Sequence, residues 1–137
     1  MYETWRGSFP LTHFIREAIS QKASLATDAC LSDEERTLLA ACNFWFEVTT
    51  CQFALRKDKS RSIVAMMRAQ DAFESIGALG VSSIINGHLN ALLPLRDGVQ
   101  VRRLLRDMED RLARVEDNVD ELVSEYATRQ SRSRIDP

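Results

Sequence analysis

The sequence predicts an all-α protein: a helical bundle of four to five helices with a long C-terminal coiled-coil-like helix. Two observations carry this prediction. Apolar residues recur at helical spacing through most of the 137 residues. Near the carboxyl end they recur at alternating steps of three and four residues over four heptads. Composition is that of an ordinary globular chain, with 45% hydrophobic and 28% charged residues, so we expect a single helical domain over 1–137.

The bundle helices are expected within residues 8–93. A broad apolar stripe predicts a first helix over about 10–29. Ser32 and Glu35 have the spacing of a capping box, in which each side chain bonds to the backbone of the other residue. The apolar positions that follow predict a second, central helix over 33–57.

Two further helices are predicted between a charged connector and the last helix. One starts at Ser60 or Ser62 and is ended by Gly77, which fits the left-handed conformation of a helix end. The other starts at Ser82 or Ser83. The pair Asn86-Gly87 is a turn signal inside it, so we expect that helix to be kinked or split.

The long heptad helix is expected over 97–128. Asp97 and Gln100 suit a capping box at its start, and residues 99–126 contain no Gly or Pro. We expect its apolar seam to be an oligomerisation or partner interface, with residues 129–137 as a frayed basic tail. The seam consists of Val101, Leu105, Met108, Leu112, Val115, Val119, Leu122 and Tyr126.

Charges are distributed unevenly along this predicted helix. Residues 99–112 hold four arginines against three carboxylates, and residues 113–126 hold one arginine against five carboxylates. An antiparallel partner would set the basic half beside the acidic half, although Arg111 and Glu116 would also pair in a parallel dimer. The alternative is that the last helix packs on its own chain. The candidate acidic partner surface consists of Glu116, Asp117, Asp120, Glu121 and Glu125.

No pattern in the sequence points to catalysis, a cofactor or a metal. The two histidines, His13 and His88, lack a glutamate three residues before them, which excludes the usual carboxylate-bridged di-iron motif. His88 is expected to be a core or interface histidine bonded to a carbonyl. Nucleophile-elbow, phosphate-loop and dinucleotide-binding motifs are absent from the sequence. We therefore expect no enzyme activity.

A helix-turn-helix is the alternative that the sequence leaves open. Leu79-Gly-Val-Ser82 follows a predicted helix in the manner of such a turn. The second helix, however, supplies no cation for phosphate contacts, and Asn86 stands where an apolar residue is expected. A nearby basic patch would consist of Arg56, Lys57, Lys59, Arg61 and Arg68.

The expected function is that of a non-enzymatic protein–protein interaction module, an adaptor, inhibitor or accessory subunit that self-associates through its C-terminal helix. The first alternative is a small transcription regulator with a coiled-coil dimerisation arm, and the second is a helical ligand-binding protein or enzyme without linear motifs. Three cysteines without a CxxC pair, no leader-like start and no long apolar run predict a cytoplasmic protein with no membrane segment. A homodimer or larger assembly is expected, and the net charge of −2 makes nucleic acid a less favoured partner.

Overall fold

The computed structural model describes residues 31–55 and 58–135, with side chains as far as Arg129. Five α-helices, one short 3-10 helix and no strand occupy these residues, which confirms the all-α prediction. The helix predicted over 10–29 lies outside the described residues. The elements are α3 (Asp33–Thr49), η2 (Phe53–Leu55), α4 (Lys59–Ile76), α5 (Leu79–Leu92), α6 (Gly98–Ala113) and α7 (Val119–Ile135).

Helix α3 starts as the sequence predicts but ends earlier. The Glu35 N–H donates to Ser32 Oγ at 3.1 Å and the Ser32 N–H donates to Glu35 Oε1 at 3.0 Å, so the capping box is confirmed. The predicted continuation to residue 57 is wrong. The Thr50 hydroxyl donates to the Phe46 carbonyl at 2.7 Å, and Cys51 then turns the chain with a φ of 58°. These features satisfy the helix end and redirect the chain into η2.

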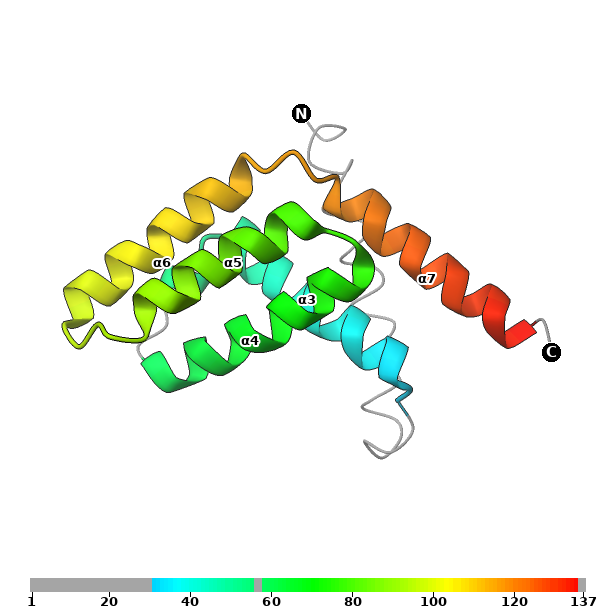
Figure 1. The fold of residues 1–137 in the computed structure, drawn as a ribbon, viewed down its shortest axis with the longest axis horizontal. Coiled ribbons are helices and arrows are strands. Elements are labelled where there is room, and N and C mark those ends of the chain that lie inside the picture. The colour runs from blue at the N-terminus through cyan, green and yellow to red at the C-terminus, as the bar shows by residue number, and fades with distance from the viewer. Residues whose placement is uncertain (1–30, 56–57, 136–137) are drawn as a thin grey trace.

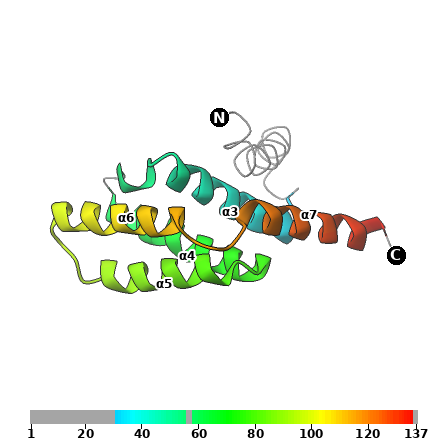
Figure 2. The same cartoon turned by 90° about the horizontal axis from the view of Figure 1, so that it is seen from above.

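Helices α4 and α5 form an antiparallel hairpin (Figures 1 and 2). Gly77 ends α4 with a φ of 98°, as predicted. The Gln70 side chain donates to Asn86 Oδ1 at 3.3 Å, so the helices still touch about two turns from their connection. Helix α5 begins at Leu79, before the predicted serine caps, and it continues through Asn86-Gly87, so the predicted kink or split is wrong.

The long helix predicted over 97–128 is divided into α6 and α7 by residues 114–118. Asp97 caps α6 by accepting the Val99 N–H at 2.8 Å. Asn118 accepts the Glu121 N–H at 3.1 Å and so begins a new helix. The neighbouring Asp117 is directed to α5 instead. Short polar side chains that bond to backbone N–H groups compete with a continuous helix, and two adjacent ones stop it here.

The core is enclosed by α3, α4, α5 and α6, while α7 contacts α3 and α4 and extends beyond them (Figures 1 and 2). Phe44, Phe53 and Phe73 are almost fully buried, and Phe44 meets both of the other rings edge to face. Trp45 packs on Phe73 in the same geometry, with ring centroids 6.0 Å apart. Helix α7 continues to Ile135, so the part of the predicted frayed tail that the structure describes is helical. Within the described residues, no helix combines the length and apolar character that crossing a bilayer requires.

Candidate functional site

The predicted seam lies against the chain's own core. Val101, Leu105, Met108, Leu112 and Val119 are buried within the chain. The other three seam residues are partly buried and pack against the same cluster; they are Val115, Leu122 and Tyr126. An oligomerisation or partner interface on the seam requires that a second chain covers it. In the structure the chain itself covers it, as in the single-chain alternative.

The predicted acidic surface is divided between the exterior and the interior. Glu116, Glu121 and Glu125 are exposed. Asp120 is only 5% exposed. Asp117 is half-buried, and its carboxylate accepts the Val81 N–H at 2.9 Å at the start of α5. Three of the five carboxylates therefore remain available to a partner, and Asp117 has a role inside the fold.

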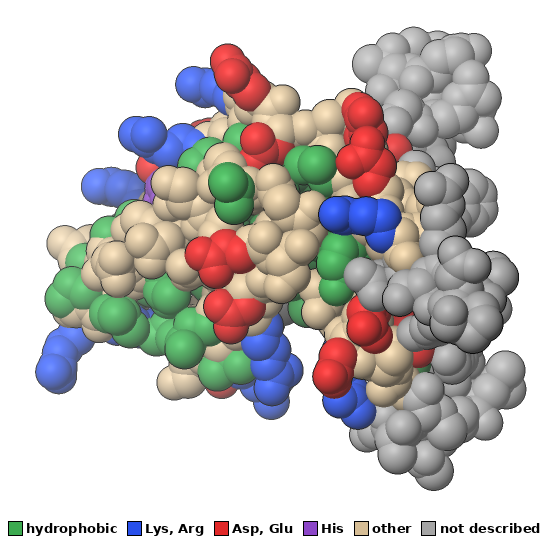
Figure 3. Space-filling model, turned by 45° about the vertical axis from the view of Figure 1, so that its right-hand side comes forward, with side chains coloured by type: hydrophobic (Ala, Val, Ile, Leu, Met, Phe, Trp, Pro, Cys, Tyr) green, Lys and Arg blue, Asp and Glu red, His purple; other side chains and the backbone are tan. Residues whose placement is uncertain are grey.

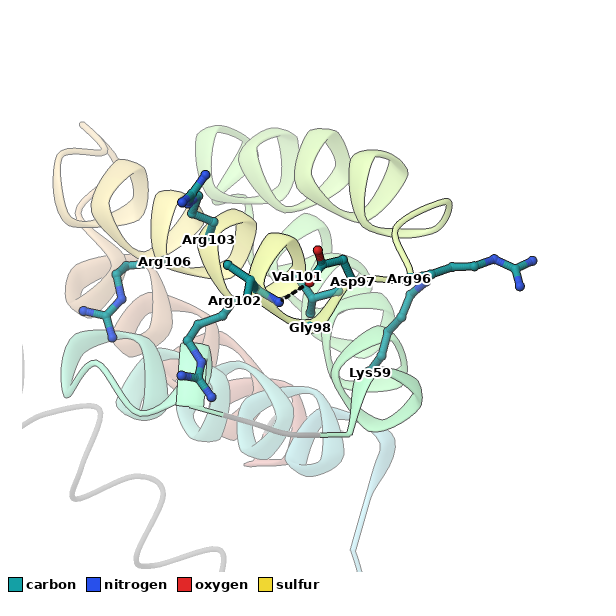
Figure 4. A pocket seen from close by; sticks show the side chains of 9 residues that line it. Lys59, Arg96, Asp97, Gly98, Val101, Arg102, Arg103 and Arg106 are labelled. Atoms are coloured by element: carbon teal, nitrogen blue, oxygen red, sulfur yellow. Dashed lines mark hydrogen bonds between the residues drawn. The ribbon is translucent and has the colours of Figure 1, made fainter.

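A cleft of about 690 Å³ opens where α6 begins (Figure 4). It is lined mainly by cationic side chains, and we call it the arginine cleft. Val99, which is 63% exposed, supplies an apolar side chain at its edge. The residues of the arginine cleft are Lys59, Arg96, Asp97, Gly98, Val99, Val101, Arg102, Arg103 and Arg106.

The four arginines of this cleft form no ion pair with a described carboxylate, unlike three other described arginines. Arg36, Arg61 and Arg111 each form an ion pair with an aspartate three or four residues earlier, at 3.3, 3.7 and 3.1 Å. Within the described residues, no ion pair satisfies any of the cleft arginines. Their guanidinium groups therefore keep their full capacity to bind carboxylates from outside. They are Arg96, Arg102, Arg103 and Arg106.

The cationic side chains of the arginine cleft extend from its edge in different directions. In Figure 4, Arg102 and Arg106 extend to the same side of α6, Arg103 projects from the other side, and Arg96 points away from the helix. Lys59 is held in place, because its ammonium group donates to the carbonyl of Leu93 at 2.9 Å and also to that of Leu95. The Asp97 carboxylate already accepts a hydrogen bond from the Val99 N–H at the start of α6. The available positive charge thus comes from the four arginines.

A second cleft of about 380 Å³ lies at the other end of α6, between α3 and the 114–118 linker. Glu109, Asp110 and Asp117 line it, together with apolar side chains such as Trp45 and Val48, and no Lys or Arg is among its described lining residues. We call it the acidic cleft. The two ends of α6 therefore carry clefts of opposite charge.

Glu109 is the buried carboxylate of the acidic cleft, with 4% exposure. It accepts the Ala54 N–H at 3.0 Å and so fixes η2 against α6. Burial raises the pKa of Glu109, and the hydrogen bonds from the backbone N–H groups of Ala54 and Phe53 only partly oppose that rise. The position of Glu109 between Met108 and Asp110 gave no sign of this role in the sequence.

A second polar link joins α5 to α6. His88 Nδ1 lies 2.8 Å from the Ile84 carbonyl oxygen, and His88 Nε2 lies 2.8 Å from Asp107 Oδ2. The predicted bond to a carbonyl is thus confirmed. A carbonyl only accepts, so Nδ1 donates, and Nε2 donates to the carboxylate when the ring carries both protons. This hydrogen bond from His88, with a further one from Arg111, lowers the pKa of Asp107 despite some desolvation.

Metal-ligating side chains do not gather in the part of the chain that the structure describes, where no three of His, Cys, Asp or Glu could hold an ion together. The described cysteines are separate: Cys42 is buried and Cys51 is exposed. Neither lies beside the single described histidine in any contact of the structure.

No protein-family model matches the chain. Comparison with curated proteins and with solved structures finds no match either.

The sequence contained a signal for the arginine cleft that the seam prediction did not use. Arg102 and Arg106 stand four residues apart, which places two like charges on one helix face at a small energetic cost. Such a pair is unexpected on a helix selected only for stability. The contribution of Lys59 from the start of α4 depends on the fold and has no signal in the sequence.

Proposed function

We propose that the chain is a non-enzymatic protein–protein interaction module whose arginine cleft binds an acidic surface of a protein partner. The observation that carries the proposal is the group of four guanidinium groups around one cleft, which have no ion-pair partner among the residues that the structure describes. Arginine is favoured at protein interfaces because its planar fork binds carboxylates with two parallel hydrogen bonds.

The arrangement of the rim favours a protein surface over a small anion. Arg96 and Arg103 point in different directions (Figure 4), so they do not converge on one small ligand. The start of α6, which otherwise attracts anions, is already capped by Asp97. Exposed Val99 adds an apolar contact that suits a partner segment in which acidic and apolar residues alternate.

Nucleic acid is supported less well by the same surface. The exposed large hydrophobic side chains of the described residues include no aromatic ring on which a base would stack. In the α4–α5 hairpin, Asn86 is bonded back to Gln70, whereas the second helix of a helix-turn-helix crosses the first steeply and is free to enter a groove. The net charge of −2 also opposes approach to a polyanion.

Binding of a labelled peptide of alternating Glu and Leu residues, measured by fluorescence anisotropy at low salt, tests the proposal. We expect saturable binding that weakens with salt and at least about tenfold when Arg102 and Arg106 are both changed to Glu, since close interfacial charge pairs couple by about 1.5 kcal/mol or more. Changing Arg68 and Arg114 both to Glu is the charge-matched control, because both residues are exposed and lie outside the cleft.

Two outcomes would overturn the proposal. One is the absence of peptide binding at low salt by a folded wild-type protein. The other is tighter retention of random-sequence duplex DNA than of the peptide, with the same arginine dependence, which would favour the transcription-regulator alternative.

A further inference from the structure

The exposed face of α6 carries a second regular stripe, opposite the buried one. Its members are separated by three or four residues, and all of them are exposed. Because such spacing keeps side chains on one helix face, they form a continuous strip along α6. We call this strip the outer stripe; it consists of Val99, Arg102, Arg106, Asp110 and Ala113.

Charge changes sign along the outer stripe. Its first half holds Arg102 and Arg106 and belongs to the arginine cleft. Its second half holds Asp110 and belongs to the acidic cleft. Exposed Glu116 follows in the linker. Helix α6 has 16 residues, so it is about 24 Å long at about 1.5 Å per residue, and the two charged regions lie at its opposite ends.

We propose that the partner of the arginine cleft is a second copy of this chain, bound with the two outer stripes antiparallel about a two-fold axis. This inference rests on the proposed function, because it names the acidic surface that the cleft binds. An axis between Arg106 and Asp110 places each Arg106 opposite Asp110 of the second copy. It also brings Arg102 of each copy towards the linker of the other, where exposed Arg114 and Glu116 both lie, so the attraction in this arrangement comes from the two Arg106–Asp110 contacts.

Charge complementarity favours this arrangement over a parallel one. A parallel pair would place Arg102 and Arg106 of one copy beside the same residues of the second copy, which is repulsive at every contact. In the antiparallel pair each contact occurs twice, as in any two-fold interface, and the assembly closes as a dimer. Ala113, a small residue, lets the helix backbones approach at the ends of the contact.

On the face shown in Figure 3, several Lys and Arg side chains project from the left edge, whereas acidic side chains lie over the centre and the right, with other basic side chains among them. The molecule is thus electrically uneven despite its small net charge. Such a distribution steers two copies towards opposite orientation as they meet, and the steering weakens with salt.

Charge reversal with sedimentation equilibrium of the whole protein at low salt tests the inference. We expect wild type to dimerise. Arg106→Glu alone and Asp110→Arg alone should each be monomeric, with dissociation constants raised at least about tenfold, because each change creates two like-charge contacts. An equimolar mixture of the two variants restores both contacts and should form a one-to-one dimer, and so should the double variant.

The exposed α4 residues Arg68 and Asp71 supply matched controls. Arg68→Glu and Asp71→Arg make the same charge changes outside the outer stripe, and they should leave the dimer intact. Thermal unfolding followed by circular dichroism establishes that each variant is folded. Should a reversal fail to fold, Arg106→Gln and Asp110→Asn replace it, with a smaller expected loss of dimer.

A wild-type protein that stays monomeric at millimolar concentration would overturn this inference, and retained binding of the acidic peptide would leave the proposed function standing. A dimer that is indifferent to both reversals, variants that do not complement each other, or a mixture that grows beyond a dimer would each overturn it as well. Loss of peptide binding together with a normal dimer would overturn the proposed function and also the contact inferred here.

Discussion

At the residue scale, the position of the Asp117 carboxylate explains why residue 80 is a glycine. The Asp117 carboxylate reaches across to the first turn of α5 and accepts the Val81 N–H at 2.9 Å. A Cβ on Gly80 would lie 2.8 Å from Asp117 Oδ2, closer than real Cβ contacts. Glycine at position 80 therefore leaves room for the carboxylate, which a side chain there would displace, with loss of its hydrogen bond to the first turn of α5.

The effect of Gly80→Ala on the free energy of unfolding should depend on whether residue 117 is Asp or Ala. In the wild type we expect Gly80→Ala to lower the free energy of unfolding, because leaving the N–H of buried Val81 without its acceptor costs about 1–3 kcal/mol, more than Ala gains in helix propensity. In an Asp117→Ala background the same change should be neutral or stabilising, since Ala exceeds Gly in helix propensity by up to about 1 kcal/mol. Urea unfolding of the four proteins gives the coupling. Equal effects in both backgrounds would contradict the contact.

Glu109→Gln should destabilise the protein less than Glu109→Ala does. Glu109→Ala leaves the buried Ala54 N–H without its acceptor, and we expect a loss of about 1–3 kcal/mol. Glu109→Gln keeps an acceptor and removes the buried charge. Because the folded pKa is raised above 4.5, ionisation of Glu109 lowers stability as pH rises from 4.5 through the folded value. Urea unfolding should therefore show the Gln variant gaining on the wild type between pH 4 and pH 7. A constant difference would contradict the raised pKa.

At the scale of elements, the division of the predicted long helix into α6 and α7 could not be predicted from the apolar spacing alone. The heptad spacing from Val101 to Tyr126, which predicts an interface, selects residues that are buried or partly buried within the chain on both helices. It did not identify the break, because apolar spacing is insensitive to a short linker that preserves the inward face. Asp117 and Asn118 were the available signal, since adjacent capping residues inside a predicted helix favour its termination.

The hydrogen bond between His88 on α5 and Asp107 on α6 should make the stability of the protein depend on pH. Its pKa is lowered from 3.8, chiefly by the hydrogen bond from His88, so its stabilising effect is complete above about pH 3.8 and is lost as pH falls through the lower folded value. We expect Asp107→Asn to melt below the wild type at pH 5 and the two melting temperatures to converge as pH falls below 3.8 through the folded pKa. Asp71→Asn, an exposed change on α4, is the control. A difference that does not shrink as pH falls below 3.8 would show that ionisation of Asp107 is not its origin.

At the scale of the whole molecule, the all-α class and most of the helices were predictable from the sequence, because caps such as Ser32 and Asp97 and the terminator Gly77 act locally. The end of α3 was not predictable, since it depends on Cys51 entering the left-handed region and on η2 being held by a distant glutamate. The arginine cleft was missed for a related reason: only the fold brings the start of α4 beside the start of α6.

The position of the seam changes what its disruption should do. Leu112 is 1% exposed, so Leu112→Asp places a charge inside the core and should lower the free energy of unfolding by at least about 3 kcal/mol, with loss of a cooperative melt. Leu55→Asp at a 55% exposed position is the control and should change stability little. Circular dichroism melts distinguish the two. A well-folded Leu112→Asp monomer would instead place the seam between chains.

The linker between α6 and α7 restricts which insertions and deletions evolution can accept in this stretch. Asp117 is bonded backwards to α5 and Asn118 forwards to α7, so two neighbouring residues anchor the chain in different directions. Inserting or deleting a single codon between them and Ala113 would pull one anchor out of reach. Natural variants of this stretch should therefore differ in composition while retaining the same number of residues.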